Sequence, residues 1–244
     1  MTALIIFIVA ALLLLVFTFM RRKSPAMFRK IEAYERLNHA VGLAVEGGTR
    51  LHVSIGRGNL FTARGGSALA GLAMLRRLSE QTSISDNPPI VTSGDASLAI
   101  LSQDTLQSGF RAAGAEDQYR VTSGRLTGLT PFAFAAGTIP IMRDENISAN
   151  VVIGDLGAEA ALLADAAEGK ETDLIAASDN LSAQSVLYAY SQEPLIGEEL
   201  FAAGAYLGAG ASHEASLQVQ DVLRWLVILA ILGGAVLKFL GIGF

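Results

Sequence analysis

Two long apolar runs frame a chain whose middle alternates between apolar and polar stretches. Residues 3–20 contain Thr18 as their one polar residue, and residues 225–244 are apolar apart from Lys238. A helix needs about 20 apolar residues to cross a bilayer, and a helix satisfies its own backbone hydrogen bonds there. The two runs therefore predict two transmembrane helices with a globular insert between them.

The charges beside the first run predict whether it is retained or cleaved, and how it is oriented in the membrane. Arg21, Arg22 and Lys23 follow the run, whereas a secretory signal peptide carries its positive charge before the apolar stretch. We therefore expect a retained anchor. Because Lys and Arg beside a membrane helix favour the cytoplasmic side, we expect a two-pass cell-membrane protein with its N-terminus outside and its insert in the cytoplasm. Lys238 can extend its side chain to the outer interface.

An amphipathic segment follows the first run. Ser24 and Pro25 suit the N-cap and first position of a helix, and Gly47-Gly48 suits its end. Apolar residues recur at helical spacing between them, with charges at the other positions. This pattern predicts a helix over residues 24–46, either a stalk or the first helix of the globular domain.

The rest of the insert alternates between short apolar runs and longer amphipathic segments. Strands are expected at residues 51–55, 90–92, 147–153 and, as the last strand, 173–177. Helices are expected at residues 65–79, 95–113, 131–145 with a kink at Pro140, 158–169, 181–190, 194–207, and from 212 into the second apolar run. Residues 118–129 fit a hairpin or a strand with a loop.

Strands that alternate with helices of ten or more residues are typical of a mostly parallel sheet. We therefore predict an α/β fold with an open, doubly wound sheet inserted between two transmembrane helices. The expected organisation is an anchor, an amphipathic helix or stalk, a globular domain, and a connecting helix with the second anchor, at residues 1–23, 24–48, 49–211 and 212–244.

Composition removes several classes of chemistry. The 244 residues include no cysteine and three histidines, and the net charge is −5. Disulfides and thiolate metal sites are therefore excluded, and His39, His52 and His213 lack the spacing of a metal site. An acidic chain argues against a nucleic-acid partner. No intact catalytic motif is present, so we expect no catalytic residues, no metal and no cofactor.

Three small polar turns follow predicted strands. They contain Ser93, Gly94 and Asp95; Gly154, Asp155 and Gly157; and Asp179. The carboxyl ends of parallel strands share one edge of the sheet, where ligands of such folds bind. The three aspartates are therefore candidates for holding a hydrated cation or a ribose hydroxyl, beside helix N-termini that favour anions. The alternative is that these residues only cap helices, which the sequence favours.

A fourth strand-end loop contains Gly56-Arg57-Gly58. It resembles the start of a dinucleotide-binding fingerprint, but Phe61 stands where the third glycine is required. Arg57 and Arg64 can nonetheless contact a phosphate or an acidic neighbour.

Four segments resemble one known family in the same order. They are residues 44–58, 147–163, 195–207 and 220–225. The chain is similar to an uncharacterised bacterial membrane-protein family, a domain of unknown function common in Chloroflexi-type bacteria. This resemblance implies one membrane-tethered unit and no particular activity.

Three functions remain open from the sequence. The first is a membrane-anchored structural protein without catalytic activity, whose partners are the lipid bilayer and further copies of itself or a larger membrane complex. The second is a ligand-binding or sensory module with a small anionic ligand or nucleotide at the strand-end edge. The third is a membrane-bound enzyme that uses the same edge.

Overall fold

The computed structural model describes residues 2–24, 27–62, 65–170 and 172–241. The chain forms two compact units, one of residues 29–208 and one that combines residues 1–28 with 209–244. Each unit is described by itself.

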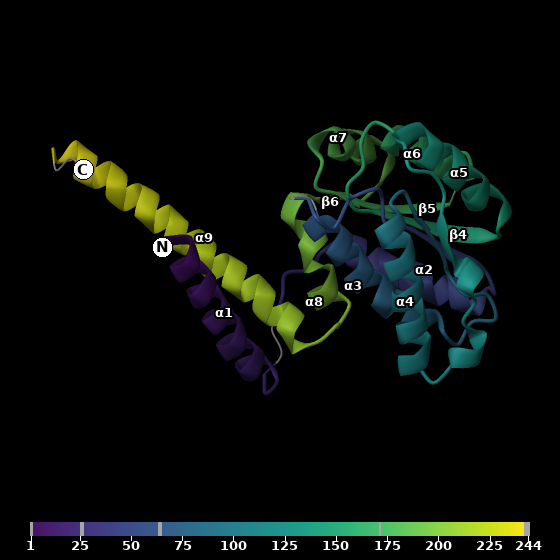
Figure 1. Ribbon diagram of the computed structural model, residues 1–244, viewed down its shortest axis with the longest axis horizontal. Coiled ribbons are helices and arrows are strands. Elements are labelled where there is room, and N and C mark those ends of the chain that lie inside the picture. The colour runs from purple at the N-terminus through teal and green to yellow at the C-terminus, as the bar shows by residue number, and fades with distance from the viewer. Residues whose placement is uncertain (1, 25–26, 63–64, 171, 242–244) are drawn as a thin grey trace. The chain divides into compact units, whose positions relative to one another are not determined.

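The described part of residues 29–208 is built on one six-stranded sheet. Its strands are β1 (Arg50–Ser54), β2 (Ile90–Ser93), β3 (Gly124–Leu126), β4 (Ile147–Ile153), β5 (Asp173–Ser178) and β6 (Leu195–Ile196). Their order in the sheet is β3-β2-β1-β4-β5-β6, and every neighbouring pair is parallel. The predicted α/β fold is therefore confirmed (Figure 1).

Helices cover both faces of the sheet, as Figure 1 shows. One face carries α2 (Glu32–Glu46), α3 (Gly65–Thr82), α4 (Ala96–Ala112) and the short α8 (Ala203–Tyr206). The other face carries α5 (Pro131–Asp144), α6 (Ala160–Glu168) and α7 (Leu181–Tyr190). Buried valines of the central strands alternate between the two faces, because successive side chains of a strand point to opposite sides.

The core on the second face shows why small residues recur in this sequence. Val152 and Ala176 of the sheet pack against a layer rich in alanine from α6, together with Phe134 and Met142 of α5. Alanine allows a helix to approach a sheet closely while it still removes apolar surface from water.

The predicted helix over residues 194–207 is wrong at its start, although residues 197–206 are helical. The expectation that residues 173–177 form the last strand is wrong. Leu195 and Ile196 form β6, which pairs with the end of β5. A 3₁₀ helix (Gly197–Ala202) and α8 follow. Two residues are too few to show a strand period, so only pairing with β5 identifies this strand.

The predicted start of the second helix is also wrong. The helix α2 begins at Glu32, and Ile31 before it is extended with φ −118° and ψ 111°. Pro25 lies outside the described residues. The predicted end at Gly47-Gly48 is confirmed, and Gly48 has φ +61°. Buried Tyr34 and Leu37 pack this helix into the unit of residues 29–208, as a helix of the domain.

The ambiguous stretch of residues 118–129 is a strand with loops rather than a hairpin. Two 3₁₀ turns, Glu116–Gln118 and Val121–Ser123, precede β3, which pairs parallel to β2.

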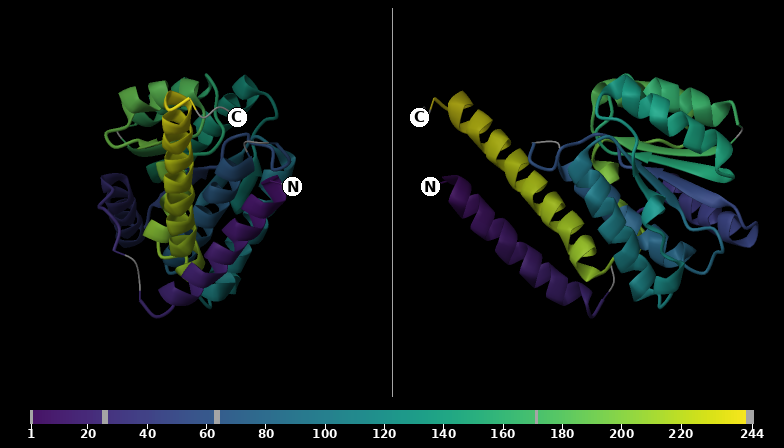
Figure 2. Two further views of the ribbon diagram at one scale, coloured as in Figure 1. Left: turned by 90° about the vertical axis from the view of Figure 1, so that its left-hand side faces the viewer. Right: turned by 45° about the vertical axis from the view of Figure 1, so that its right-hand side comes forward.

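The other unit contains two long helices that lie side by side, α1 (Thr2–Arg21) and α9 (Ala211–Phe239). Among the described residues, these two are long and apolar enough to cross a membrane. Figure 2 shows them as an antiparallel pair. Arg21 at the end of α1 donates from Nε to Gln218 Oε1 of α9 at 2.9 Å.

Candidate functional site

The strand order places a topological switch point between the carboxyl ends of β1 and β4. The helix α3 follows β1 on one face, whereas α6 follows β4 on the other face. The chain therefore leaves this pair of strands in opposite directions, and ligands of open α/β sheets bind at such a switch point. The order of six strands is also the one that dinucleotide-binding domains use.

Two glycines let the backbones of these strand ends approach closely. Gly56 has φ +69°, and a Cβ there would lie 2.7 Å from the Asp155 carbonyl oxygen. Gly154 has φ +118°, and its Cβ would lie 2.4 Å from the Ile55 carbonyl oxygen. The Arg57 N–H donates to the Asp155 carbonyl at 3.0 Å. The two strand ends are therefore packed backbone against backbone, an approach that only glycine allows at these two positions.

An ion pair joins the loop after β1 to the turn after β4. Arg57 Nε donates to Glu159 Oε1 at 2.7 Å, and the side chains are 24% and 1% exposed. Gly94 makes room for the arginine, because a Cβ at that position would lie 2.2 Å from Arg57 Cγ. The guanidinium is thus held by a buried carboxylate from the turn after β4.

The environment of Glu159 keeps it charged. Burial by itself raises the pKa of this carboxyl. The hydrogen bond from Arg57, backbone N–H groups of Gly157 and Glu159, and the guanidinium charge outweigh burial and hold the pKa below its usual range. Gly157 leaves room for this carboxylate, since a Cβ there would lie 2.8 Å from Glu159 Oε2.

Arg57 retains hydrogen-bonding capacity. Its Nε binds Glu159, and no hydrogen bond found among the described residues uses either of its Nη groups. Two Nη groups of a fixed guanidinium match the oxygens of a phosphate or carboxylate. This arrangement is therefore able to bind an anion.

The three candidate aspartates have different local roles. Asp95 caps α4, because its Oδ1 accepts from the N–H groups of Ser97 and Leu98. Asn180, and not Asp179, caps α7 by accepting from the N–H of Ser182. Asp155 precedes the first residue of α6 by five positions, which is too far for a cap. Capping thus explains Asp95, but it does not explain the other two aspartates.

Two predicted site residues carry buried polar atoms without a partner. Within the described part of the chain, Asp179 Oδ1 and Ser93 Oγ have no hydrogen bond. Buried polar atoms are normally paired, so such atoms point to a role beyond packing.

The aspartates do not converge on one point. Asp95 follows β2 and Asp179 follows β5, so three strand spacings, roughly 14 Å, separate their strands. Across residues 2–24, 27–62, 65–170 and 172–241, no group of three acidic or histidine side chains is placed to hold a metal ion.

A second polar group lies inside the sheet. His52 Nδ1 is 2.9 Å from Asn150 Oδ1, and its Nε2 is 2.9 Å from Thr92 Oγ1. Asn150 Nδ2 donates to Thr172 Oγ1 at 2.8 Å. Burial lowers the pKa of His52 to about 4, so the imidazole is neutral at pH 7. We call these four residues the mid-sheet row.

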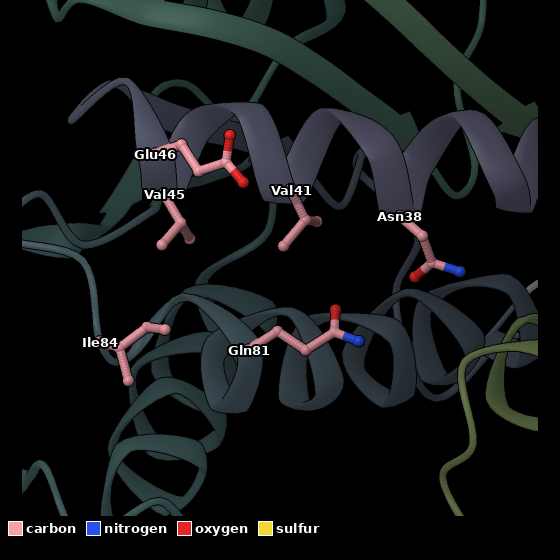
Figure 3. Close-up of a pocket in the computed structure, with 7 residues that line it drawn as sticks. Asn38, Val41, Val45, Glu46, Gln81 and Ile84 are labelled. Atoms are coloured by element: carbon pink, nitrogen blue, oxygen red, sulfur yellow. The ribbon is translucent and has the colours of Figure 1, made fainter.

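A shallow groove of about 670 Å³ lies between α2 and the C-terminal end of α3 (Figure 3). Val41, Val45 and Ile84 provide its apolar surface, and Gln81 places a buried Oε1 there. The groove is at the amino edge of the sheet, opposite to its carboxyl edge, because α2 and α3 end where β1 and β2 begin.

We call Arg57, Glu159, Ser93 and Asp179 the strand-end group. Sequence reasoning missed one of these residues. Glu159 stands in an alanine-rich helix start, where glutamate is common, so nothing in its local sequence marks it. The signal that was available is Arg57, whose partner only the fold identifies.

Comparison with known proteins identifies the family. No curated protein and no solved structure matches the chain. A family model described as "Domain of unknown function (DUF6754)" matches residues 1–244. The match spans the whole chain, so the expected membership of an uncharacterised domain family is confirmed, and this protein belongs to the DUF6754 family.

Proposed function

We propose that this protein is a membrane-anchored binding module whose ligand is a small anion with hydroxyl groups, such as a nucleotide. The observation that carries the proposal is the Arg57 guanidinium, fixed at the β1/β4 switch point by buried Glu159 with both Nη groups available. Phosphate or carboxylate oxygens of the ligand would accept from these groups.

The hydroxyl groups of the ligand are assigned to the carboxylates at the same edge. Asp155 is the second residue after β4, and Asp179 has a buried, unpartnered Oδ1 among the described residues. Carboxylates accept hydrogen bonds from ribose hydroxyls, whereas they repel a bare anion. The mixture of one guanidinium and several carboxylates therefore favours a ligand that carries both groups.

The membrane anchoring in this proposal rests on the two apolar helices. Both α1 and α9 are long enough to span a bilayer, and the cations at residues 21–23 favour the cytoplasmic side. We infer a two-pass topology with the domain of residues 29–208 in the cytoplasm. An origin in Chloroflexi-type bacteria remains a prediction.

Binding to the full chain in detergent tests the proposal. Thermal shift and calorimetric titration would be run with ATP, NAD and inorganic phosphate. We expect at least one nucleotide to bind the wild type and to lose tenfold or more in affinity, about 1.4 kcal/mol, in the double variant Arg57→Met with Glu159→Gln. The double change avoids a buried, unpaired charge.

The matched control is Arg111→Met, which removes an exposed arginine paired with Glu116 away from the strand ends. It should bind as the wild type does. Equal affinity of all three proteins for every nucleotide, or no binding at all, would refute the proposal.

A homo-oligomeric scaffold or a part of a larger membrane complex is the second candidate, since two anchors on one domain suit assembly. The mass of the detergent-solubilised particle tests it. A defined multiple of 25.6 kDa would support assembly, and a single-chain mass would argue against it.

A further inference from the structure

The carboxyl edge of the sheet displays exposed apolar side chains from separate loops. Phe61 follows β1 and is 91% exposed, and Leu181 at the start of α7 is 79% exposed. Leu129 after β3 and Phe132 in the first turn of α5 are exposed as well. We call these four residues the apolar rim.

The parallel topology places the apolar rim along one edge of the sheet. The four residues belong to segments that are up to 120 positions apart, but each follows the carboxyl end of a strand of the same sheet. Strand spacing spreads them over roughly 19 Å, from β3 to β5. Several exposed apolar side chains along one edge favour a membrane or protein contact.

Both ends of the unit of residues 29–208 lie near the carboxyl edge of the sheet. Arg29 forms an ion pair with Glu199, which lies three residues after the last residue of β6. Tyr206 Oη donates to the Arg29 carbonyl oxygen at 2.7 Å, and the Tyr34 and Tyr206 rings stack at 4.9 Å. Residues 29 and 206 are thus fastened to each other and to the segment that follows the sheet edge.

We propose that the apolar rim contacts a lipid bilayer surface, with Phe61 and Leu181 inserted into the interfacial layer. The segments that join the unit of residues 29–208 to the two apolar helices leave it beside this edge, so the bilayer is the surface that we assign to the rim. Aromatic and aliphatic side chains gain free energy in this layer, where their apolar area is removed from water. This inference rests on the membrane anchoring of the proposed function, and not on its ligand.

The charge of the carboxyl edge predicts which lipid headgroups the apolar rim contacts more closely. Asp95, Asp155 and Asp179 all follow strand ends, so the edge carries several carboxylates. Because like charges repel, the contact should be closer on zwitterionic lipid than on anionic lipid.

Single-cysteine labelling provides the test, since the chain has no cysteine of its own. Phe61→Cys and Leu181→Cys would each carry an environment-sensitive fluorophore in the full chain, reconstituted into phosphatidylcholine vesicles. Ile84→Cys is the matched control, because Ile84 is 77% exposed but lies before β2 at the opposite edge. All three side chains are exposed, so a label there replaces no buried contact.

We expect a nitroxide quencher attached to lipid near the headgroup to quench labels 61 and 181 severalfold more than label 84. Iodide in water should show the reverse order. Replacing part of the lipid with phosphatidylglycerol should weaken the lipid quenching.

Equal lipid quenching at the three positions would overturn the inference. A second result would also overturn it: labels 61 and 181 could be shielded from iodide without being quenched by the lipid nitroxide. This result would mean that the two residues contact protein rather than lipid. Vesicle flotation separates this failure from that of the anchoring itself, because a chain without anchors would not float. Nucleotide titration of the same samples reports separately on the ligand.

Discussion

The mid-sheet row and the strand-end group both place polar side chains across several strands, but they differ in how completely these side chains are paired. In the mid-sheet row, Thr92, His52, Asn150 and Thr172 form a continuous chain of hydrogen bonds. The strand-end group instead keeps both Nη groups of Arg57 and the Oδ1 of Asp179 without partners among the described residues.

This difference separates structure from candidate function. A neutral, fully paired row at the centre of a sheet fixes the register of β1, β2 and β4, because a slip by one residue would move His52 away from both of its partners. Polar groups that stay unpaired at the strand ends do not stabilise the fold. A ligand can form hydrogen bonds with these groups.

The largest expected effect comes from breaking the ion pair. Replacing Glu159 with alanine leaves the Arg57 guanidinium largely buried without its partner, and we expect a loss of about 3 kcal/mol in the free energy of unfolding. Urea denaturation of the detergent-solubilised chain measures it. The double variant Arg57→Met with Glu159→Met should recover most of this loss. A loss in this double variant that equals the sum of the losses in Arg57→Met and Glu159→Met alone would contradict a coupled pair.

The mid-sheet row should make the free energy of unfolding depend on pH in the acid range. The pKa of His52 is about 4 in the folded chain and about 6.5 when unfolded, so the unfolded state binds a proton first as the pH falls. The contribution of His52 is complete above pH 6.5 and is lost between pH 6.5 and 4, by up to roughly 3 kcal/mol.

The comparison with His52→Gln isolates this contribution from that of the carboxylates. Glutamine keeps a donor and an acceptor but does not titrate, so the free energy of unfolding of this variant should fall less between pH 6.5 and 4. Parallel curves for the two proteins would show that His52 does not control this window.

The smallest effects distinguish caps from site residues. Asp95→Ala and Asn180→Ala remove side-chain caps of α4 and α7, so each should cost about 1 kcal/mol. Asp179→Ala removes no cap, and its loss should stay within about 0.5 kcal/mol or reverse in sign. Chemical denaturation checks all three, and a large loss for Asp179→Ala would place this residue among the structural ones.

Long and strongly patterned segments were predictable from the chain. The strand Ile147–Ile153 and the helix Leu181–Tyr190 have the predicted bounds, because a buried run of β-branched residues and a helical period of ten residues leave little choice. Short or weakly patterned segments were not predictable from the chain. The strand β6 exists because β5 offers an open edge, and α2 starts at Glu32 although Ser24 and Pro25 also fit a helix start.

The candidate site divides in the same way. The sequence by itself determined the α/β class, the two apolar helices, the confinement of polar turns to strand ends, and the presence of a glycine-flanked Arg57, since each of these depends on residue types at short spacing. Only the tertiary structure decided that β1 lies beside β4, that Glu159 holds Arg57 across 102 positions, and that Asp95 is a cap whereas Asp179 is not. These facts depend on contacts between distant segments, and local spacing carries no information about them.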